Sequence, residues 1–166
     1  MRKSLFVLLS ILFVSLVSGC CGGSKDDSKQ ERVEYENTDF NYSIVLPAGF
    51  GTSTVDSIEN VRGGKLFTKE GCQIDVTAMK MEPITSAELL VKESMRVQKD
   101  VYEDGEAKMI DSLSFIVKGT DDFGLHANYE SQQKGNKYRI DMTYPPNKKE
   151  QFEKDVDEVI KSFKVK

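Results

Sequence analysis

The sequence predicts an α+β domain in which a mostly antiparallel β-sheet of about six strands packs against two main helices. Several segments alternate apolar and polar residues, which is the pattern of a strand with one buried face. Two longer segments repeat apolar residues at helical spacing. Only short turns separate most successive strands, so these strands run antiparallel and the doubly wound parallel arrangement is excluded. The predicted order is β-β-β-α-β-β-β-α.

Three strands precede the first helix. The first, over 40–46, places aromatic and aliphatic residues on one face and stops at Pro47. A short second strand is expected over 65–68, and a third over 72–79, where apolar and polar residues alternate. Pro83 ends this third strand, because proline has no N–H to donate to a neighbour.

The first helix opens with a capping box. The Thr85 hydroxyl is placed to cap free backbone N–H groups, and Glu88 is placed to reach back. The helix is expected to end near Asp104-Gly105. One stripe of its residues follows helical spacing, which predicts the face that packs on the sheet. This stripe consists of Ala87, Leu90, Ser94, Val97 and Val101.

Three more strands follow, over 108–118, 124–132 and 137–144. Gly135-Asn136 is a tight-turn sequence and predicts a hairpin between the last two. The second helix begins at Asn147, with Glu150 three residues later in a related capping arrangement. Its apolar stripe is the clearest in the chain and consists of Phe152, Val156, Val159, Ile160 and Phe163.

The first 19 residues differ from the rest of the chain. They contain two charges, Arg2 and Lys3, and an almost unbroken apolar run from Leu5 to Val17. As a helix this run would reach about 20 Å, short of the roughly 30 Å hydrocarbon core of a bilayer. A basic start, an apolar run and a small-residue exit at Ser18-Gly19 are typical of a secretory signal peptide.

Val17-Ser18-Gly19-Cys20 resembles the lipobox of prokaryotic lipoproteins, in which an aliphatic residue and two small residues precede the modified cysteine. Leu is commoner than Val at the first position. The resemblance implies cleavage before Cys20 and attachment of a diacylglycerol to its sulfur. Each buried methylene group would add about 0.8 kcal/mol to membrane binding. The alternative is ordinary signal cleavage that leaves Cys20 unmodified.

The chain therefore divides into a lipoprotein signal peptide (1–19), a lipidated, flexible tether (20–37) and a globular domain (38–166). The tether is rich in Gly, Ser and charged residues and has too little apolar surface to order itself. Cys72 lies in an alternating apolar segment, where cysteine usually behaves as a small buried apolar residue. For Cys21 a free thiol, a second acylation and a disulfide with Cys72 are the alternatives.

Composition excludes several classes of function. The chain has 166 residues, one His, three Cys and a net charge of −4, which becomes −6 once Arg2 and Lys3 are removed. Nucleic-acid binders carry a basic patch, so no nucleic-acid partner is expected. With so few His and Cys residues we also predict no catalytic residue, no cofactor and no metal site.

Three short segments carry a family resemblance: the first strand Phe40–Pro47, the strand Lys137–Tyr144 and the ending Val159–Lys164. With the order of elements they resemble the PsbP-like family over most of residues 38–166, which implies a PsbP-like α/β sandwich. Members of that family act as extrinsic subunits, assembly factors or lipoproteins of unknown role and share no catalytic set. The resemblance therefore implies a non-catalytic domain. Photosynthetic members bind calcium or manganese environments, for which this sequence has no matching ligands.

Several residues with reactive side chains have an ordinary structural explanation. His126 is expected on the polar face of its strand, where a solvated side chain is commoner than a general base. A thiol–imidazole pair with Cys72 would lack any known signature. Asp121-Asp122 lacks the spacing of an EF-hand and is expected to form a turn.

Three tyrosines, Tyr129, Tyr138 and Tyr144, lie on neighbouring predicted strands. They either line a ligand groove or fill the core beneath the sheet, which is the usual role. We expect an outward-facing, membrane-anchored lipoprotein, held to the cell membrane by lipid on Cys20, whose domain binds an envelope protein or supports envelope assembly. The alternative is a small-ligand-binding or carrier lipoprotein. An enzyme is the least expected reading, because no acid, base and nucleophile converge.

Overall fold

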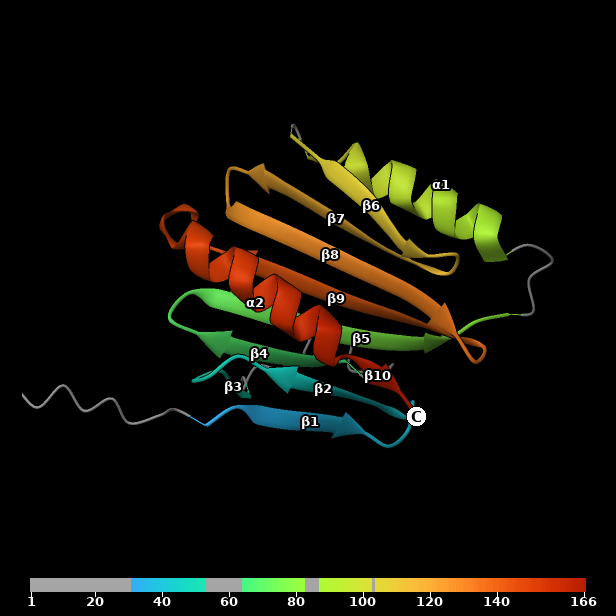
Figure 1. The fold of residues 1–166 in the computed structure, drawn as a ribbon, viewed down its shortest axis with the longest axis horizontal. Coiled ribbons are helices and arrows are strands. Elements are labelled where there is room, and N and C mark those ends of the chain that lie inside the picture. Colours follow the sequence, from blue (N-terminus) through green and yellow to red (C-terminus); the bar gives the residue numbers. More distant parts are fainter. Residues whose placement is uncertain (1–30, 53–63, 83–86, 103) are drawn as a thin grey trace, which may run out of the picture.

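Ten strands form two antiparallel sheets in the part of the chain that the computed structural model describes, residues 31–52, 64–82, 87–102 and 104–166 (Figure 1). In chain order the elements are β1 (Val33–Asn37), β2 (Tyr42–Leu46), β3 (Gly51–Thr52), β4 (Lys65–Lys69), β5 (Cys72–Lys80), α1 (Ala87–Lys99), β6 (Glu106–Asp111), β7 (Ser114–Asp121), β8 (Gly124–Gln133), β9 (Asn136–Tyr144), a 3-10 helix (Pro146–Lys148), α2 (Lys149–Ser162) and β10 (Lys164–Val165).

The large sheet has the strand order β3-β4-β5-β9-β8-β7-β6, and the small sheet has the order β1-β2-β10. Every pair of neighbouring strands in both sheets is antiparallel. The predicted α+β class with two main helices is confirmed. The count of about six strands was too low, because short strands such as β3 and β10 carry no periodic pattern.

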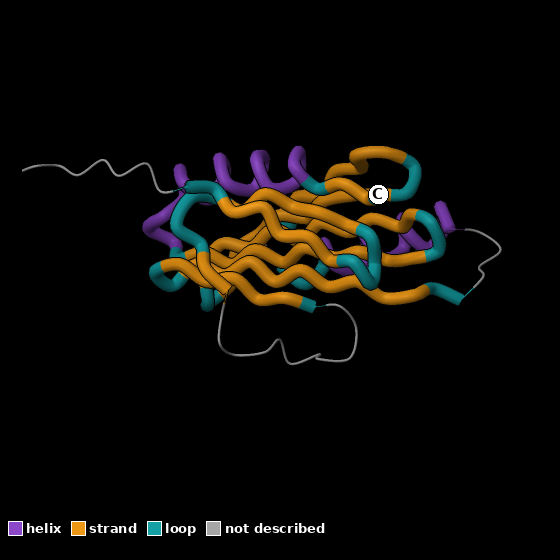
Figure 2. Tube along the Cα trace, turned by 90° about the horizontal axis from the view of Figure 1, so that it is seen from below, coloured by secondary structure: helices purple, strands orange, loops and turns teal. Residues whose placement is uncertain are grey.

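The two helices lie on opposite faces of the large sheet. Ile116 of β7 belongs to the main core, whereas its neighbours Phe115 and Val117 form a smaller cluster with Val91 of α1. Successive side chains of a strand point to opposite faces, so α1 packs on the face away from the main core. On the other face α2 and the small sheet cover the main core, and Figure 2 shows α2 on one side of the strand layer.

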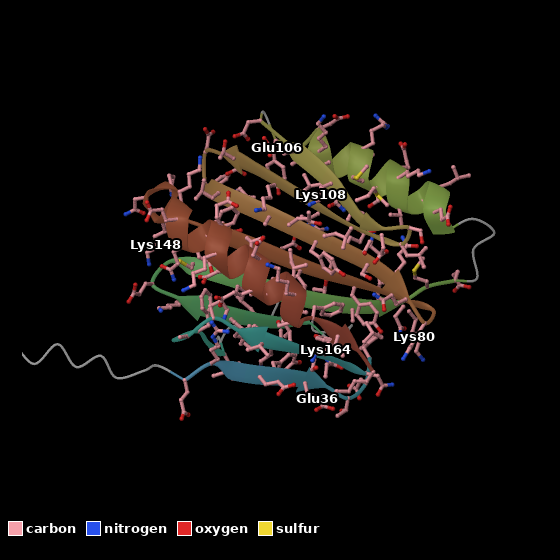
Figure 3. The ribbon with its side chains drawn as sticks, viewed as in Figure 1. Glu36, Lys80, Glu106, Lys108, Lys148 and Lys164 are labelled. Carbon is pink, nitrogen blue, oxygen red and sulfur yellow. The ribbon has the colours of Figure 1, made fainter. Side chains whose placement is uncertain are left out.

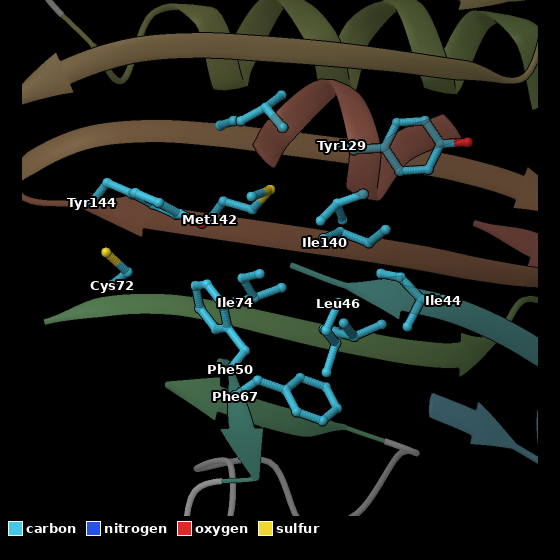
Figure 4. Packing of buried hydrophobic residues seen from close by; sticks show 14 of the residues in the cluster. Ile44, Leu46, Phe50, Phe67, Cys72, Ile74, Tyr129, Ile140, Met142 and Tyr144 are labelled. Carbon is cyan, nitrogen blue, oxygen red and sulfur yellow. The ribbon is translucent and has the colours of Figure 1, made fainter. Parts of the chain in front are cut away.

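The main core joins both sheets to α2 (Figure 4). Strands β5 and β9 contribute every second residue to it, as the alternation of their sequences predicted. The stripe predicted for the second helix is also confirmed, since Phe152, Val156 and Val159 are buried and Ile160 and Phe163 pack against them. Asparagine does not cap this helix, however: its first turn follows the 3-10 helix, and the N-cap residue Lys148 makes no capping side-chain hydrogen bond.

Strand β1 corrects the predicted boundary between tether and domain. The tether was expected to run to residue 37, but Val33–Asn37 pairs along its whole length with β2. Tyr35 packs edge-on against Tyr42 and Phe67, with ring centroids 6.0 and 5.2 Å apart. This strand was missed because most of its residues are exposed, so only Tyr35 and Asn37 signal burial.

A hairpin replaces the single strand predicted over 108–118. The chain turns between β6 and β7, where the Asp111 side chain accepts a hydrogen bond from the Leu113 N–H at 2.8 Å. This side-chain-supported turn contains Asp and Ser, which favour turns, but neither Gly nor Pro, the strongest turn signals. The later hairpin was predicted correctly, although Lys134 and Gly135, both with positive φ, make its turn and Asn136 begins β9.

Helix α1 packs with a different face from the predicted one. Val91 is fully buried, and Met95 and Tyr102 pack against its cluster. The predicted stripe lies beside this face, and its members Val97 and Val101 are exposed. Thr85, the predicted cap, lies outside the described residues.

Candidate functional site

The α1 side of β8 and β9 carries a buried polar cluster centred on Glu130. The Glu130 side chain is fully buried, and one of its oxygens, Oε2, receives every contact. Ser94 Oγ and Gln98 Nε2 of α1 donate to it at 3.2 and 3.0 Å. Lys137 Nζ of β9 lies 2.7 Å from the same oxygen. A buried carboxylate is costly unless it is paired, so these contacts tie α1 to the sheet and neutralise the charge.

Other polar atoms of this cluster have no protein donor. The oxygens Glu130 Oε1, Gln98 Oε1, Asn128 Oδ1 and Gln132 Oε1 are buried and accept no hydrogen bond from the described residues. Buried water is the usual partner of such atoms. Within the same residues no group of three or more His, Cys, Asp or Glu is placed to hold a metal ion.

Asp141 of β9 forms the next part of the cluster. Arg139 Nε lies 2.7 Å from Asp141 Oδ2, and the Asn128 amide donates to the other carboxylate oxygen. Burial raises the pKa of Asp141, and the Arg139 guanidinium opposes that rise. Asp75 of β5 is the register partner of Asp141, so two carboxylates meet on this face of the sheet.

His126 lies at the end of the cluster, and both of its ring nitrogens are engaged. Nε2 lies 2.7 Å from Asp121 Oδ1, and Nδ1 lies 3.3 Å from Thr143 Oγ1. The Tyr102 ring stacks on the imidazole at a centroid distance of 5.4 Å. His126 therefore shares its face with Asn128, as predicted, but the expectation of a solvated side chain is wrong, because only 15% of it is exposed.

Asp121, His126 and Thr143 place a carboxylate, an imidazole and a hydroxyl in a row, which is the kind of arrangement that nucleophilic catalysis uses. Such a site also needs N–H donors aimed at the oxyanion that forms. Thr143 lies on β9, which is paired on one side with β5 and on the other with β8. The backbone around its hydroxyl is therefore engaged in the sheet, and the row supports the β7–β8 turn.

Asp121 forms that turn, as predicted. Its Oδ1 accepts hydrogen bonds from the N–H groups of Phe123 and Gly124 at 2.7 and 3.1 Å. Burial alone would raise the pKa of Asp121, but the hydrogen bonds from Phe123 and His126 outweigh it, so the net pKa is lowered.

Cys72 and His126 do not form a pair. Cys72 is fully buried in the main core, whereas His126 lies on the opposite face of the sheet. Burial raises the pKa of the Cys72 thiol, which keeps it protonated. Figure 4 shows Cys72 beside Tyr144 in the core.

The three tyrosines fill the core. Tyr138 and Tyr144 are fully buried, and Tyr129 is 6% exposed. The Phe163 ring lies 5.7 Å from Tyr129 and 5.5 Å from Tyr138 between centroids. The groove that would support a small-ligand carrier is therefore filled by packed rings.

Tyr144 has a polar partner that the sequence did not reveal. Its hydroxyl donates to Asp155 Oδ2 of α2 at 2.9 Å, and Asp155 is only 4% exposed. Burial and the Asp155 carboxylate raise the pKa of the Tyr144 hydroxyl. At the N-terminus of α2, the N-cap residue Lys148 (labelled in Figure 3) binds the Glu70 carboxylate at 3.0 Å and so joins the helix to the β4–β5 turn.

A pocket of about 200 Å³ opens between α2 and the β6 edge of the large sheet. Leu125, Phe152 and Glu106 of β6 are among the residues that line it. Lys118 and Glu153 also line it and form an ion pair at 2.5 Å. Its volume is below the roughly 300–1,000 Å³ that is typical of small-molecule sites.

Two predicted features of the N-terminal part stay predictions. Cys20 and the apolar run lie outside the described residues. Among the residues that are described, no helix has the length and apolar character needed to cross a membrane.

No family model and no curated protein matches this chain. Among solved structures, the chain is similar to the solution structure of cyanobacterial PsbP (CyanoP) from Synechocystis sp. PCC 6803, with a TM-score of 0.58. The match covers 90% of this chain and 99% of that chain, at 17% sequence identity. At this identity the likeness shows the fold, so the domain has a PsbP-like fold, as the sequence motifs predicted.

Proposed function

We propose that this chain is a lipoprotein, anchored in the cell membrane by a diacylglycerol on Cys20, whose PsbP-like domain faces outward and binds a protein partner without catalysing a reaction. The main support for lipid anchoring is the sequence Val17-Ser18-Gly19-Cys20, which follows directly after a basic start and an apolar run. Signal architecture and motif together are more specific than either alone.

The domain supports a binding role in two ways. The polar residues of the α1 side are engaged with one another: Glu130 with Lys137, Asp141 with Arg139, and His126 with Asp121. A catalytic centre instead keeps a reactive group available to a substrate. Six of the seven exposed large apolar side chains of the described residues lie on α1, in the turn after it, on β6 or in the β7–β8 turn, namely Leu89, Leu90, Val97, Val101, Ile110 and Phe123, and the seventh, Val33, lies on β1. Exposed apolar surface of this kind is typical of protein interaction sites.

Metabolic labelling with an alkyne fatty acid tests the anchor. We expect the wild-type chain to carry the label and to sediment with membranes, because the two acyl chains of the diacylglycerol on Cys20 are buried in the bilayer. The Cys20→Ala variant should lose the label and accumulate as the unprocessed precursor. Cys21→Ala is the matched control, and it should keep the label on Cys20.

Label that persists in Cys20→Ala would contradict lipid attachment at this position. A mature chain that is cleaved before Cys20 but carries no lipid would instead support ordinary secretion. Mass spectrometry of the N-terminal peptide distinguishes these outcomes directly, since the diacylglyceryl group adds its own mass to Cys20.

A further inference from the structure

Helix α1 carries two apolar stripes, and the fold uses one of them. Val91 is fully buried against the sheet. On the second stripe Leu90 and Val97 are 43% and 51% exposed, and Val101, in the turn that follows α1, is 68% exposed. Exposing three large aliphatic side chains in one row costs solvation free energy, which a docking partner would recover.

The second stripe follows the spacing of a helix–helix seam. From Leu90 through Ser94 and Val97 to Val101 the steps are four, three and four residues. This is the a/d spacing of a coiled coil, in which a second helix packs its own apolar row into the first. Helix α1 ends at Lys99, and Val101 continues the row in the turn that follows, where its N–H donates to the Gln98 carbonyl. The helical part of the row, from Leu90 to Val97, spans about 10 Å, and Val101 extends the row beyond the end of α1.

The contacts of α1 fix where this stripe points. Ser94 and Gln98 donate to Glu130 of β8, while Val91 packs on β7. Going around the helix axis from Val91, one meets first Gln98, then Ser94 and then the exposed apolar side chains of the stripe. The stripe therefore lies on the side of α1 that faces β8. A helix docked there would lie along α1 and above the polar face of β8 and β9.

The free flank of the stripe is acidic. Glu93 of α1 and Asp100, in the turn after it, lie about 60–80° around the axis from the stripe, on the side away from the sheet, and the exposed Leu89 lies on the same flank. Arg96 bridges both, at 2.7 Å to Glu93 and 3.4 Å to Asp100, which leaves one net negative charge. The lysines Lys92 and Lys99 lie further round the helix, on the opposite flank.

The position of α1 favours a partner other than the anchoring membrane. The chain enters the domain at β1, on the lower edge of the molecule in Figure 1, whereas α1 lies on the upper edge. The stripe is therefore remote from the point at which the tether joins the domain.

From this geometry we propose that the stripe of Leu90, Val97 and Val101 docks an amphipathic helix of another protein, with an apolar row and basic residues on the flank that faces Glu93 and Asp100. The proposal rests on the proposed function and names the class of its partner. A second copy of α1 fits less well. In an antiparallel pair, Glu93 of each copy would face Asp100 of the other copy, and these like charges would repel. In a parallel pair, the second helix would need the side of α1 that carries Gln98, and the sheet occupies that side.

Site-specific photo-crosslinking in the native host tests the proposal. A benzophenone amino acid replaces Val97 in the full-length chain, and Lys92 on the opposite flank is the matched control position. We expect the Val97 probe to join a segment with apolar residues at helical spacing and Lys or Arg on one side, identified by peptide mass spectrometry. The Lys92 probe should not join that segment.

Charge reversal sharpens the test. Asp100→Lys should lower the Val97 adduct yield about fivefold, because it replaces attraction by repulsion at an exposed pair. Lys92→Glu in the same background should leave the yield unchanged. A Val97 adduct with lipid, with a second copy of the chain or with a segment lacking basic residues overturns the proposal, as does no adduct.

The outcomes separate this inference from the function on which it rests. A protein adduct from probes at Ile110 or Phe123 but none at Val97 would leave the protein-binding role intact and overturn the docking site. Absence of lipid on Cys20 would contradict the anchor while leaving the Val97 result to decide the site.

Discussion

Gly119 of β7 lies directly beneath Tyr102, at the junction of α1 with the sheet. A Cβ atom added at this glycine would lie 2.4 Å from Tyr102 Cβ and 2.6 Å from Cγ. These atoms are close to the backbone, so a rotation of the side chain cannot remove the clash. The missing side chain therefore allows the Tyr102 ring to stack on His126.

Gly119→Ala should destabilise the domain by about 1–3 kcal/mol, the usual cost of overpacking. Urea unfolding measures this change. Gly51→Ala is the matched control: a Cβ there meets nothing within 4 Å, and the expected change is within about 0.5 kcal/mol. Equal stability of the two variants would contradict a close approach at Tyr102.

The ionisation of Asp121 makes the stability of the fold depend on pH in the acid range. Against the effect of burial, the hydrogen bonds from Phe123 and His126 hold the pKa of Asp121 in the folded chain below its ordinary value, so the ionised form stabilises the fold. This contribution is present above the unfolded-state pKa and is lost as the pH falls through the folded-state pKa. The stability difference between wild type and Asp121→Asn should therefore be larger at about pH 6 than at about pH 3.

Urea midpoints at the two pH values measure that difference. Asp122→Asn removes a negative charge from the same turn and serves as the matched control. If the stability difference between wild type and Asp121→Asn instead grew as the pH fell, that result would contradict a lowered pKa of Asp121.

At the scale of elements, α1 depends on a polar attachment as well as an apolar one. Its buried apolar cluster is small, with Val91, Phe115 and Val117 fully buried. The Glu130 cluster adds contacts from Ser94 and Gln98 on the helix and from Lys137 on β9. Removing one partner of this cluster leaves a buried charge without compensation.

Lys137→Met should cost about 2 kcal/mol, less than the 3–5 kcal/mol typical of a broken buried pair, because the lysine side chain is 26% exposed. In a Glu130→Gln background the same change should cost much less, since no buried charge remains. A double-mutant cycle from urea unfolding gives the coupling. A cost of Lys137→Met that is the same in both backgrounds would contradict the ion pair.

The same element shows why its packing face could not be predicted. Both stripes of α1 follow helical spacing, and the one with more aliphatic residues is the exposed one. Helical periodicity finds amphipathic faces but does not rank them. The choice depended on β6 and β7, whose hairpin the sequence did not reveal because Asp111 supports a turn without Gly or Pro.

At the scale of the whole molecule, β1 joins the N-terminal segment to the folded domain. It is the outer strand of the small sheet, and Tyr35 packs on both Tyr42 and Phe67. The small sheet in turn covers the main core beside α2. The folded domain thus begins at Val33, five residues before its predicted start at residue 38.

Truncation tests this boundary. A chain that begins at Glu31 keeps β1, and a chain that begins at Thr38 lacks it. The shorter chain should be less stable by about 2 kcal/mol or more, since each lost aromatic pair alone is worth about 0.5–1.5 kcal/mol. Equal urea midpoints would show that β1 belongs to the tether.

The sequence by itself determined the α+β class, the main strands of the large sheet and the buried face of α2. These follow from local periodicity, which the chain carries in single segments such as Cys72–Lys80. It also determined the signal-like start and the Cys20 motif, which are read from consecutive residues.

Only the tertiary structure decided which face of α1 is buried, where the fold begins and how the polar residues pair. The partners of Glu130 come from α1 and β9, and those of His126 from β7 and β9. Such contacts depend on strand register and on which elements meet across the sheet. No local pattern encodes them, because residues far apart in sequence must be brought together before their charges and shapes can match.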